Sequence, residues 1–252
     1  MPDETLHARI AADLRRRIND ELAPGTPLPS EAALGSQYGV SRITARRAYQ
    51  TLEQEGLVTA HIGRGRVVRK HRRMVYQPQR EFEPRRSATM DRFMTTLTEE
   101  GRNPTQQIEV AVEPARGIVA ERFGVPEDTP LAARKRVRYL DGEPFNASDT
   151  YYLHEVAKNT IVMNPADIPQ GSNAVIRAIM GGETHVIDEY YVRMPTPAEA
   201  ERLRLGQGTP VAIHYATGYT SDGRVIRVSY GLIPGDRHVI VYERTSPPDA
   251  QQ

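Results

Sequence analysis

The chain has 252 residues, of which 38% are hydrophobic and 26% are charged, with a formal net charge of +1. This composition is normal for a soluble globular protein, and the lack of cysteine excludes disulfides, thiolate metal sites and a cysteine nucleophile. The sequence has no run of about 18 apolar residues that could span a membrane, and its acidic start is unlike a signal peptide. We therefore expect a cytoplasmic protein without a membrane partner.

The charge is distributed unevenly along the chain. Residues 1–75 carry 13 basic and 8 acidic side chains, whereas the remaining residues carry 20 basic and 24 acidic ones. A basic block beside an acidic remainder suggests contact with nucleic acid at one end. A basic run alone is more often a solvated face, so the choice between a solvated face and a DNA-binding surface depends on the surrounding sequence pattern.

Apolar residues spaced by four predict a first amphipathic helix. They are Leu6, Ile10, Leu14, Ile18 and Leu22. Pro24 and Gly25 end this helix. Ser30 is placed to cap a short helix that runs through Tyr38, and Gly39 can adopt the positive φ that closes it.

A third helix is expected to begin after Ser41 and to end near Gly56. Its buried face follows the spacing i, i+3, i+4, i+7. That face consists of Ala45, Ala48, Tyr49 and Leu52. Arg42, Arg46 and Arg47 lie off it. Arg42 and Arg46 are one turn apart, so their side chains point the same way.

Two short apolar runs, at residues 57–60 and 66–68, surround a glycine-containing basic turn at residues 61–65. This arrangement predicts a β-hairpin. Three helices followed by a basic-tipped hairpin make a winged helix-turn-helix, which we assign to residues 1–70.

The rest of the chain predicts a second, α+β domain. Residues 71–89 are polar, basic and proline-containing, which suits a linker or a docking strand. In residues 90–245 the mixed order of helices and strands, with Asp-Gly turns, favours a largely antiparallel sheet. Helices are expected at 90–100, 118–123 and 197–205, and strands at 108–112, 131–140, 147–152, 186–194, 211–219, 225–232 and 238–242. Residues 246–252 are expected to be a disordered tail.

The segment from Pro29 to Val68, PSEAALGSQYGVSRITARRAYQTLEQEGLVTAHIGRGRVV, resembles the DNA-binding domain of the GntR family of bacterial regulators. The helices, the turn and the wing match in register. The resemblance implies that Arg42, Thr44 and Arg46 meet the operator and that Gly63 approaches the minor groove.

Physical chemistry agrees with that implication. Arginines at the start of a recognition helix can pair bidentately with guanine, and short hydroxyl donors suit phosphates. An arginine in the wing adds minor-groove attraction. The candidate DNA-binding residues are Ser41, Arg42, Thr44, Arg46, Arg47, Gly63 and Arg64. The chain departs from many relatives at Ala32, where they carry an arginine that reaches DNA, so their operator sequences cannot simply be carried over.

The C-terminal part resembles the UTRA ligand-binding domain of the HutC subfamily, whose fold is similar to chorismate lyase. The matching pieces are EEGRNPTQQIEV (99–110), RVRYLDGEPF (136–145), TPAEAERLRLGQGTPV (196–211) and YTSDGRVIRVSYGLIPGDRH (219–238). The resemblance implies a homodimer that contacts itself through this domain and binds a small-molecule effector.

By the same resemblance, the effector pocket is lined by residues of the first helix and of the strands around the Asp-Gly turns. They are Arg92, Phe93, Arg136, Arg138, Ser148, Thr150 and Ser229. Carboxylates that sugar-phosphate-binding relatives often carry are replaced here by Ser148 and Arg227, so an amino-sugar phosphate is disfavoured. Buried arginines call for an anionic or polar effector. Each of these arginines could equally be a solvated surface charge.

The scattered histidines have no metal-ligand spacing, so no metal or cofactor is expected. The resulting hypothesis is a repressor that a small polar or anionic effector releases from a palindromic operator. Two alternatives remain: an enzyme of chorismate-lyase-like fold, for which no catalytic constellation is found, and a repressor that needs no ligand.

Overall fold

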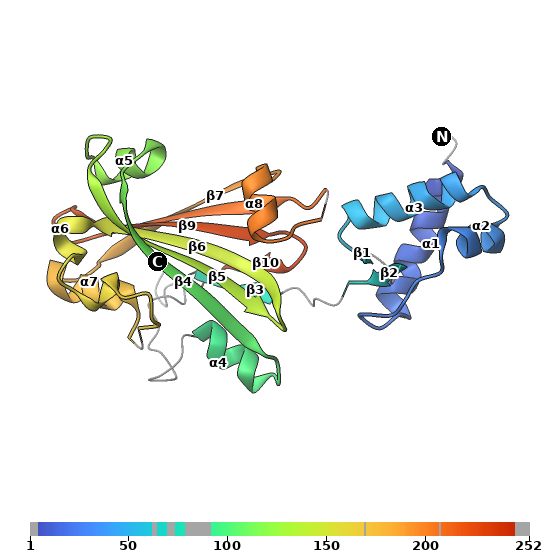
Figure 1. The fold of residues 1–252 in the computed structure, drawn as a ribbon, viewed down its shortest axis with the longest axis horizontal. Coiled ribbons are helices and arrows are strands. Elements are labelled where there is room, and N and C mark those ends of the chain that lie inside the picture. Colours follow the sequence, from blue (N-terminus) through green and yellow to red (C-terminus); the bar gives the residue numbers. More distant parts are fainter. Residues whose placement is uncertain are drawn as a thin grey trace, which may run out of the picture. The chain divides into compact units, whose positions relative to one another are not determined.

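The computed structural model describes residues 5–61, 65–69, 74–78, 92–168, 170–206 and 208–244, with only the backbone at residues 61, 92 and 93. The chain forms two units (Figure 1). The first comprises residues 1–74, 194–210 and 234–238, and the second comprises residues 75–193, 211–233 and 239–252. Among the described residues, no helix is long and apolar enough to cross a membrane.

The first unit begins with the three predicted helices and the hairpin. The helices are α1 (Leu6–Asp20), α2 (Glu31–Tyr38) and α3 (Arg42–Gln54), and the strands are β1 (Val58–His61) and β2 (Gly65–Val68). β1 and β2 pair antiparallel, with Val58 opposite Val68. The winged helix-turn-helix predicted from apolar spacing is therefore confirmed.

Local capping explains where α2 and α3 begin and how the chain turns between them. The Ser30 side chain accepts a hydrogen bond from the Ala33 amide, and the Ser41 side chain accepts one from the Thr44 amide, which satisfies amides that lack a partner inside the helix. Gly39 ends α2 with a φ of 65°, a conformation that glycine adopts without a steric penalty.

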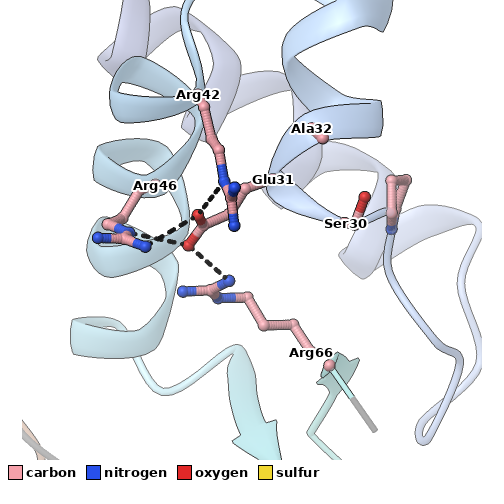
Figure 2. Close-up of a pocket in the computed structure, with 8 residues that line it drawn as sticks. Ser30, Glu31, Ala32, Arg42, Arg46 and Arg66 are labelled. Carbon is pink, nitrogen blue, oxygen red and sulfur yellow. Dashed lines mark hydrogen bonds and ion pairs between the residues drawn. The ribbon is translucent and has the colours of Figure 1, made fainter. Parts of the chain in front are cut away.

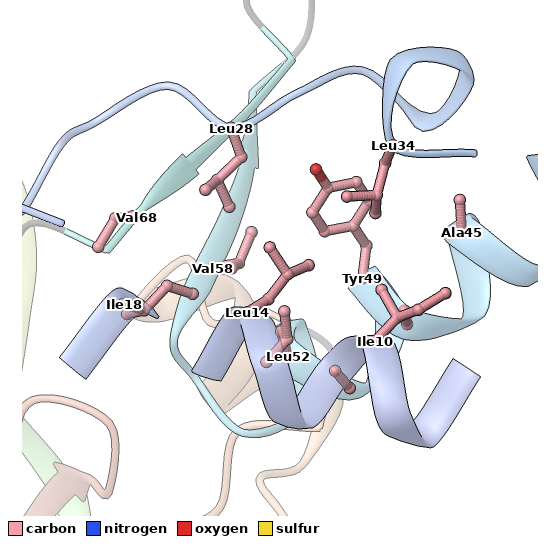
Figure 3. Close-up of a cluster of buried hydrophobic side chains, with 12 residues drawn as sticks. Ile10, Leu14, Ile18, Leu28, Leu34, Ala45, Tyr49, Leu52, Val58 and Val68 are labelled. Carbon is pink, nitrogen blue, oxygen red and sulfur yellow. The ribbon is translucent and has the colours of Figure 1, made fainter. Parts of the chain in front are cut away.

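One hydrophobic core holds these elements together (Figure 3). Leu14 from α1, Leu34 from α2 and Leu52 from α3 are fully buried, and Val58 joins them from the wing. Tyr49 is also fully buried, and its hydroxyl satisfies itself by donating to the Pro29 carbonyl at 2.6 Å. This packing fixes the orientation of α3, so its opposite face is presented to solvent.

The second unit is built on a six-stranded sheet with the order β4-β5-β6-β9-β8-β7. The strands are β4 (Pro104–Pro114), β5 (Pro130–Leu140), β6 (Glu143–Leu153), β7 (His185–Arg193), β8 (Val211–Tyr219) and β9 (Val225–Pro234). The pairs β4–β5, β5–β6, β6–β9 and β7–β8 are antiparallel. Asp141 and Gly142 both take positive φ at the β5–β6 turn, as an Asp-Gly hairpin turn requires. The expected α+β architecture is confirmed.

Helices flank the sheet. They are α4 (Arg92–Glu99), α5 (Gly117–Phe123), α6 (His154–Ala157), the 3₁₀ turn η2 (Ile161–Met163) and α7 (Ser172–Met180); α8 (Pro197–Arg202) precedes β8 in the chain. None of α6, η2 and α7 was predicted from the sequence. They pack on buried residues of the sheet, including Ala132 and Tyr152, and in Figure 1 α6 and α7 lie together at the end of the sheet where β6 finishes.

A second, two-stranded sheet is formed by β3 (Met74–Tyr76) and β10 (His238–Ile240). Within residues 71–89, for which a linker or a docking strand is expected, residues 74–76 form β3, and residues 71–73 and 79–89 lie outside the described residues. The expected disordered tail, residues 246–252, lies outside the described residues.

Candidate DNA-binding and effector sites

The solvent-facing side of α3 carries the predicted DNA-binding arginines. The Arg42 and Arg46 side chains are 72% and 57% exposed, and Arg47 is also exposed. Ser41 and Thr44 lie at the N-terminus of the helix, where their hydroxyl oxygens are 2.9 Å apart. Five of the seven predicted residues thus lie on the first two turns of α3. The other two, Gly63 and Arg64, lie outside the described residues.

A buried carboxylate that the sequence analysis did not single out joins these arginines (Figure 2). Glu31, the first residue of α2, is 9% exposed. Its Oε1 accepts hydrogen bonds from Arg46 Nε at 3.0 Å and Arg66 Nη1 at 3.1 Å. Its Oε2 accepts from Arg42 Nε and Arg46 Nη2, both at 3.2 Å. One carboxylate therefore ties α2, α3 and the wing strand β2 together.

The Arg66 side chain has further fixed contacts in the wing. Its Nε donates to Glu53 Oε1 at 2.6 Å, and its guanidinium carbon lies 4.7 Å from the centre of the Tyr49 ring, a cation–π distance. Arg66 is consequently held by two carboxylates and one aromatic face.

The arginines determine the ionisation of Glu31. Hydrogen bonds, above all from Arg46, lower the pKa of its carboxyl group from 4.5 to about 2, although burial opposes the shift. Glu31 is therefore ionised at neutral pH. The stabilisation that follows from a lowered pKa is present above about pH 4.5 and is lost as the pH falls toward 2.

A solvent-accessible hollow of about 330 Å³ opens beside this cluster. Ser30, Ala32, Arg42, Arg46 and Arg66 are among the residues that line it. The short side chain of Ala32 leaves this space open.

Three residues of this surface were not predicted from the sequence. Glu31 could be read only as an acidic residue that favours a helix start, and Arg66 only as part of a strand. The third is Ile43, which is 68% exposed on α3 and has the aliphatic character that suits contact with a thymine methyl group. The sequence could have indicated Ile43, because it is an apolar residue that lies off the buried face of the helix.

In the second unit, the register of three strands brings five predicted effector residues onto one face. Arg136 in β5 lies opposite Ser148 in β6, and Arg138 lies opposite Asn146. Thr150 lies opposite Ser229 in β9, and their hydroxyl oxygens are 3.2 Å apart. Residues directly opposite each other, and residues two apart along a strand, share a face. Arg92 and Phe93 begin α4, but their side chains are not among those described.

Arg134 continues the arginine row of β5 beside η2 and was not predicted from the sequence. It is 3% exposed and donates to the carbonyls of Val162, Asn164 and Ala166 at 2.6–3.0 Å. Burial lowers the pKa of its guanidinium group. Arg136, with a side chain 17% exposed, lies 3.9 Å from Asp167. These arginines are enclosed and do not form a solvated surface.

Next to Ser229, this face contains a buried ion pair. Arg227 Nε donates to Glu183 Oε1 at 2.9 Å, and the two side chains are 1% and 0% exposed. Arg227 also donates to the Ser229 hydroxyl at 3.1 Å, and Arg177 reaches the other Glu183 oxygen at 3.4 Å. A Cβ at Gly218 would overlap the Glu183 carboxylate, so the glycine makes room for the pair.

A winged helix-turn-helix with an exposed arginine face, together with a separate α+β domain, defines a transcription regulator with DNA-binding and sensing parts. Residues 6–68 match the gntR family of bacterial regulatory proteins, and residues 99–239 match the UTRA domain. The chain belongs to the gntR family of bacterial regulatory proteins and carries a UTRA domain. The enzyme alternative is wrong, because these families consist of regulators.

Relatives that match over most of their length are also transcription regulators. The chain is 29% identical to an uncharacterized HTH-type transcriptional regulator, SCO4628, of Streptomyces coelicolor, over 96% of this chain and 92% of the relative. It is 27% identical to the mannosyl-D-glycerate transport/metabolism system repressor MngR of Escherichia coli, over 98% and 99%. A solved structure ascribed to the GntR family of transcriptional regulators superposes with a TM-score of 0.62 and 26% identity, over 97% and 99%.

Proposed function

We propose that this regulator is a repressor that a small polar or anionic effector releases from a palindromic operator. The proposal is carried by the presence in one chain of an exposed arginine surface on α3 and of a separate, enclosed arginine row on β5. Repression itself is inferred from similarity to relatives such as MngR, which is a repressor.

On the DNA side, α3 enters the major groove with its N-terminal residues at the base edges. Arg42 and Arg46 pair with guanines, and Ser41, Thr44 and Arg47 contact phosphates. Gly63 and Arg64 bring the wing to the minor groove. Ala32 leaves a hollow beside these arginines, so the operator differs from those of relatives with arginine at this position.

The first prediction concerns assembly: the protein binds its operator as a homodimer. One winged helix reads too few base pairs to select one site among a genome of competitors, and two related by symmetry double the contacts and require a palindrome. Sedimentation at micromolar concentration should give twice the chain mass, and titration should give two chains per palindrome. A monomer that binds the palindrome one to one would contradict the prediction.

The second prediction concerns the effector. An anion placed on the arginine row gains charge-assisted hydrogen bonds from groups that are already enclosed. We expect metabolites with a phosphate or carboxylate group to raise the melting temperature, and to weaken operator binding by roughly 5–150-fold, the range typical of such coupling. By linkage, operator DNA must weaken effector binding by the same factor.

Two variants on neighbouring positions of β5 test the effector site. Arg136→Ala should abolish most of the melting-temperature rise. Lys135→Ala should not, because Lys135 points to the other face of the sheet, where it pairs with Glu113 at 2.5 Å. A ligand that stabilises the parent and Arg136→Ala equally would remove Arg136 from the site. A ligand that binds tightly but leaves operator affinity unchanged would favour the ligand-independent repressor.

A further inference from the structure

The Glu31 carboxylate stands in a position that simple attraction to DNA does not explain. It carries a negative charge between three arginines, Arg42, Arg46 and Arg66, on the face of the protein that is proposed to meet DNA. Against the phosphate backbone this charge is repulsive. The Glu31 carboxylate must therefore favour DNA binding in another way than by attracting DNA.

The geometry indicates that the carboxylate orders the arginine side chains. Both oxygens of Glu31 are occupied, and Arg46 binds them with two nitrogens at 3.0 and 3.2 Å. Two parallel N–H···O bonds fix the plane of a guanidinium group. The same carboxylate holds Arg42 through Nε. Two long and otherwise exposed side chains are thus ordered before DNA arrives, so less conformational freedom is lost on binding.

The link to Arg66 extends this order to the wing. Arg66 lies 35 positions from Glu31 in the chain and is itself fixed by Glu53 and the Tyr49 ring. The carboxylate therefore sets the guanidinium groups of the recognition helix in a defined position relative to β2.

We propose that Glu31 is a specificity-determining positioning residue, which orients Arg42 and Arg46 for base recognition and limits the attraction of this surface to DNA of any sequence. The inference rests on the proposed function of α3 as the recognition helix. It predicts opposite effects on two kinds of DNA. Loss of the Glu31 charge weakens binding to the operator, because the arginines are no longer oriented. The same loss strengthens binding to unrelated DNA, because the surface becomes more positive.

The test compares Glu31→Gln with Glu55→Gln in the full-length protein. The dissociation constants for an operator obtained by selection from random DNA, and for unrelated DNA of equal length, are measured over a salt series. Glu31→Gln should lower the ratio of operator to unrelated affinity by about 10-fold or more, on the scale of one lost base contact. Glu55→Gln removes the same charge at the other end of α3, where Glu55 accepts a hydrogen bond from Arg15 Nε at 2.7 Å and its side chain is 32% exposed. It should leave the ratio within about twofold of the parent.

Two further variants keep the inference testable. Glu31→Asp retains the charge but shortens the side chain, and it should lower the ratio without strengthening binding to unrelated DNA. If Glu31→Gln fails to fold, as judged by circular dichroism, the affinity ratio of Glu31→Asp alone tests the inference, and an unchanged ratio in this variant would overturn it. In a background of Arg42→Ala and Arg46→Ala, the Glu31→Gln change should have little additional effect on the ratio, because Glu31 acts through these arginines.

The outcomes distinguish failure of the positioning role of Glu31 from failure of the proposed function of α3. An unchanged ratio in Glu31→Gln, or an equal fall in Glu55→Gln, would overturn the positioning role while α3 remains the recognition helix. A parent protein that selects no sequence, or an Arg42→Ala variant that binds the operator as tightly as the parent, would instead overturn the proposed function itself.

Discussion

Replacing Glu183 by glutamine should lower the free energy of unfolding of the second unit by about 3–5 kcal/mol. Glu183 and its partner Arg227 are 0% and 1% exposed. A buried charge pair contributes little net stability, but removal of one partner leaves the other charge in a medium of low polarity without its counterion. Glutamine keeps the shape of the side chain, so the expected loss comes from the charge.

Urea unfolding followed by tyrosine fluorescence measures this effect, because the chain has 12 tyrosines and no tryptophan to mask them. Glu155→Gln is the matched control. Glu155 pairs with Lys158 at 2.6 Å, but its side chain is 80% exposed, and such surface pairs contribute little. The double variant Glu183→Gln with Arg227→Met should recover most of the lost stability, since both charges are then absent. Equal midpoints for Glu183→Gln and Glu155→Gln would show that the pair is not buried in solution.

Replacing Arg42 by alanine should weaken operator binding by about 1–3 kcal/mol, the usual cost of a lost bidentate contact to a base. Arg46→Ala should weaken binding by a comparable factor. Both residues begin the exposed face of α3, and both are held in place by Glu31. Since they share this partner, the two losses should not be additive.

Fluorescence anisotropy with operator and unrelated DNA measures these losses. Arg16→Ala is the control for charge, because it removes one positive charge from α1, where Arg16 pairs with Asp13. It should weaken operator and unrelated DNA alike and only slightly, whereas Arg42→Ala should mainly weaken the operator complex. An Arg42→Ala variant with the affinity of the parent would show that α3 is not the recognition helix.

The amino-acid sequence by itself determined the elements of the first unit. A spacing of four between Ile10, Leu14 and Ile18 predicted α1, and Ser30 and Ser41 marked the starts of α2 and α3. These signals are local. Helix periodicity and capping depend on residues within one or two turns of each other, so they can be read without knowing the fold.

In the second unit, the strands were predicted from their apolar runs, whereas α6, η2 and α7 were missed. These three elements are short, and they are stabilised by packing against sheet residues such as Ala132 and Tyr152. Most helical stability in proteins comes from such tertiary packing and not from intrinsic propensity. The sequence of residues 154–180 therefore carried too weak a local signal.

Which side chains meet was decided by the tertiary structure alone. The sequence identified Arg42 and Arg46 as a pair one turn apart, but not the carboxylate of Glu31 between them and Arg66. It predicted Arg136 and Ser148 separately, whereas the register of β5 and β6 places them opposite each other. Local patterns specify which face a residue occupies on its own element. Contacts between elements depend on how cores pack and how strands align, because a shift of one residue would exchange the faces of a strand.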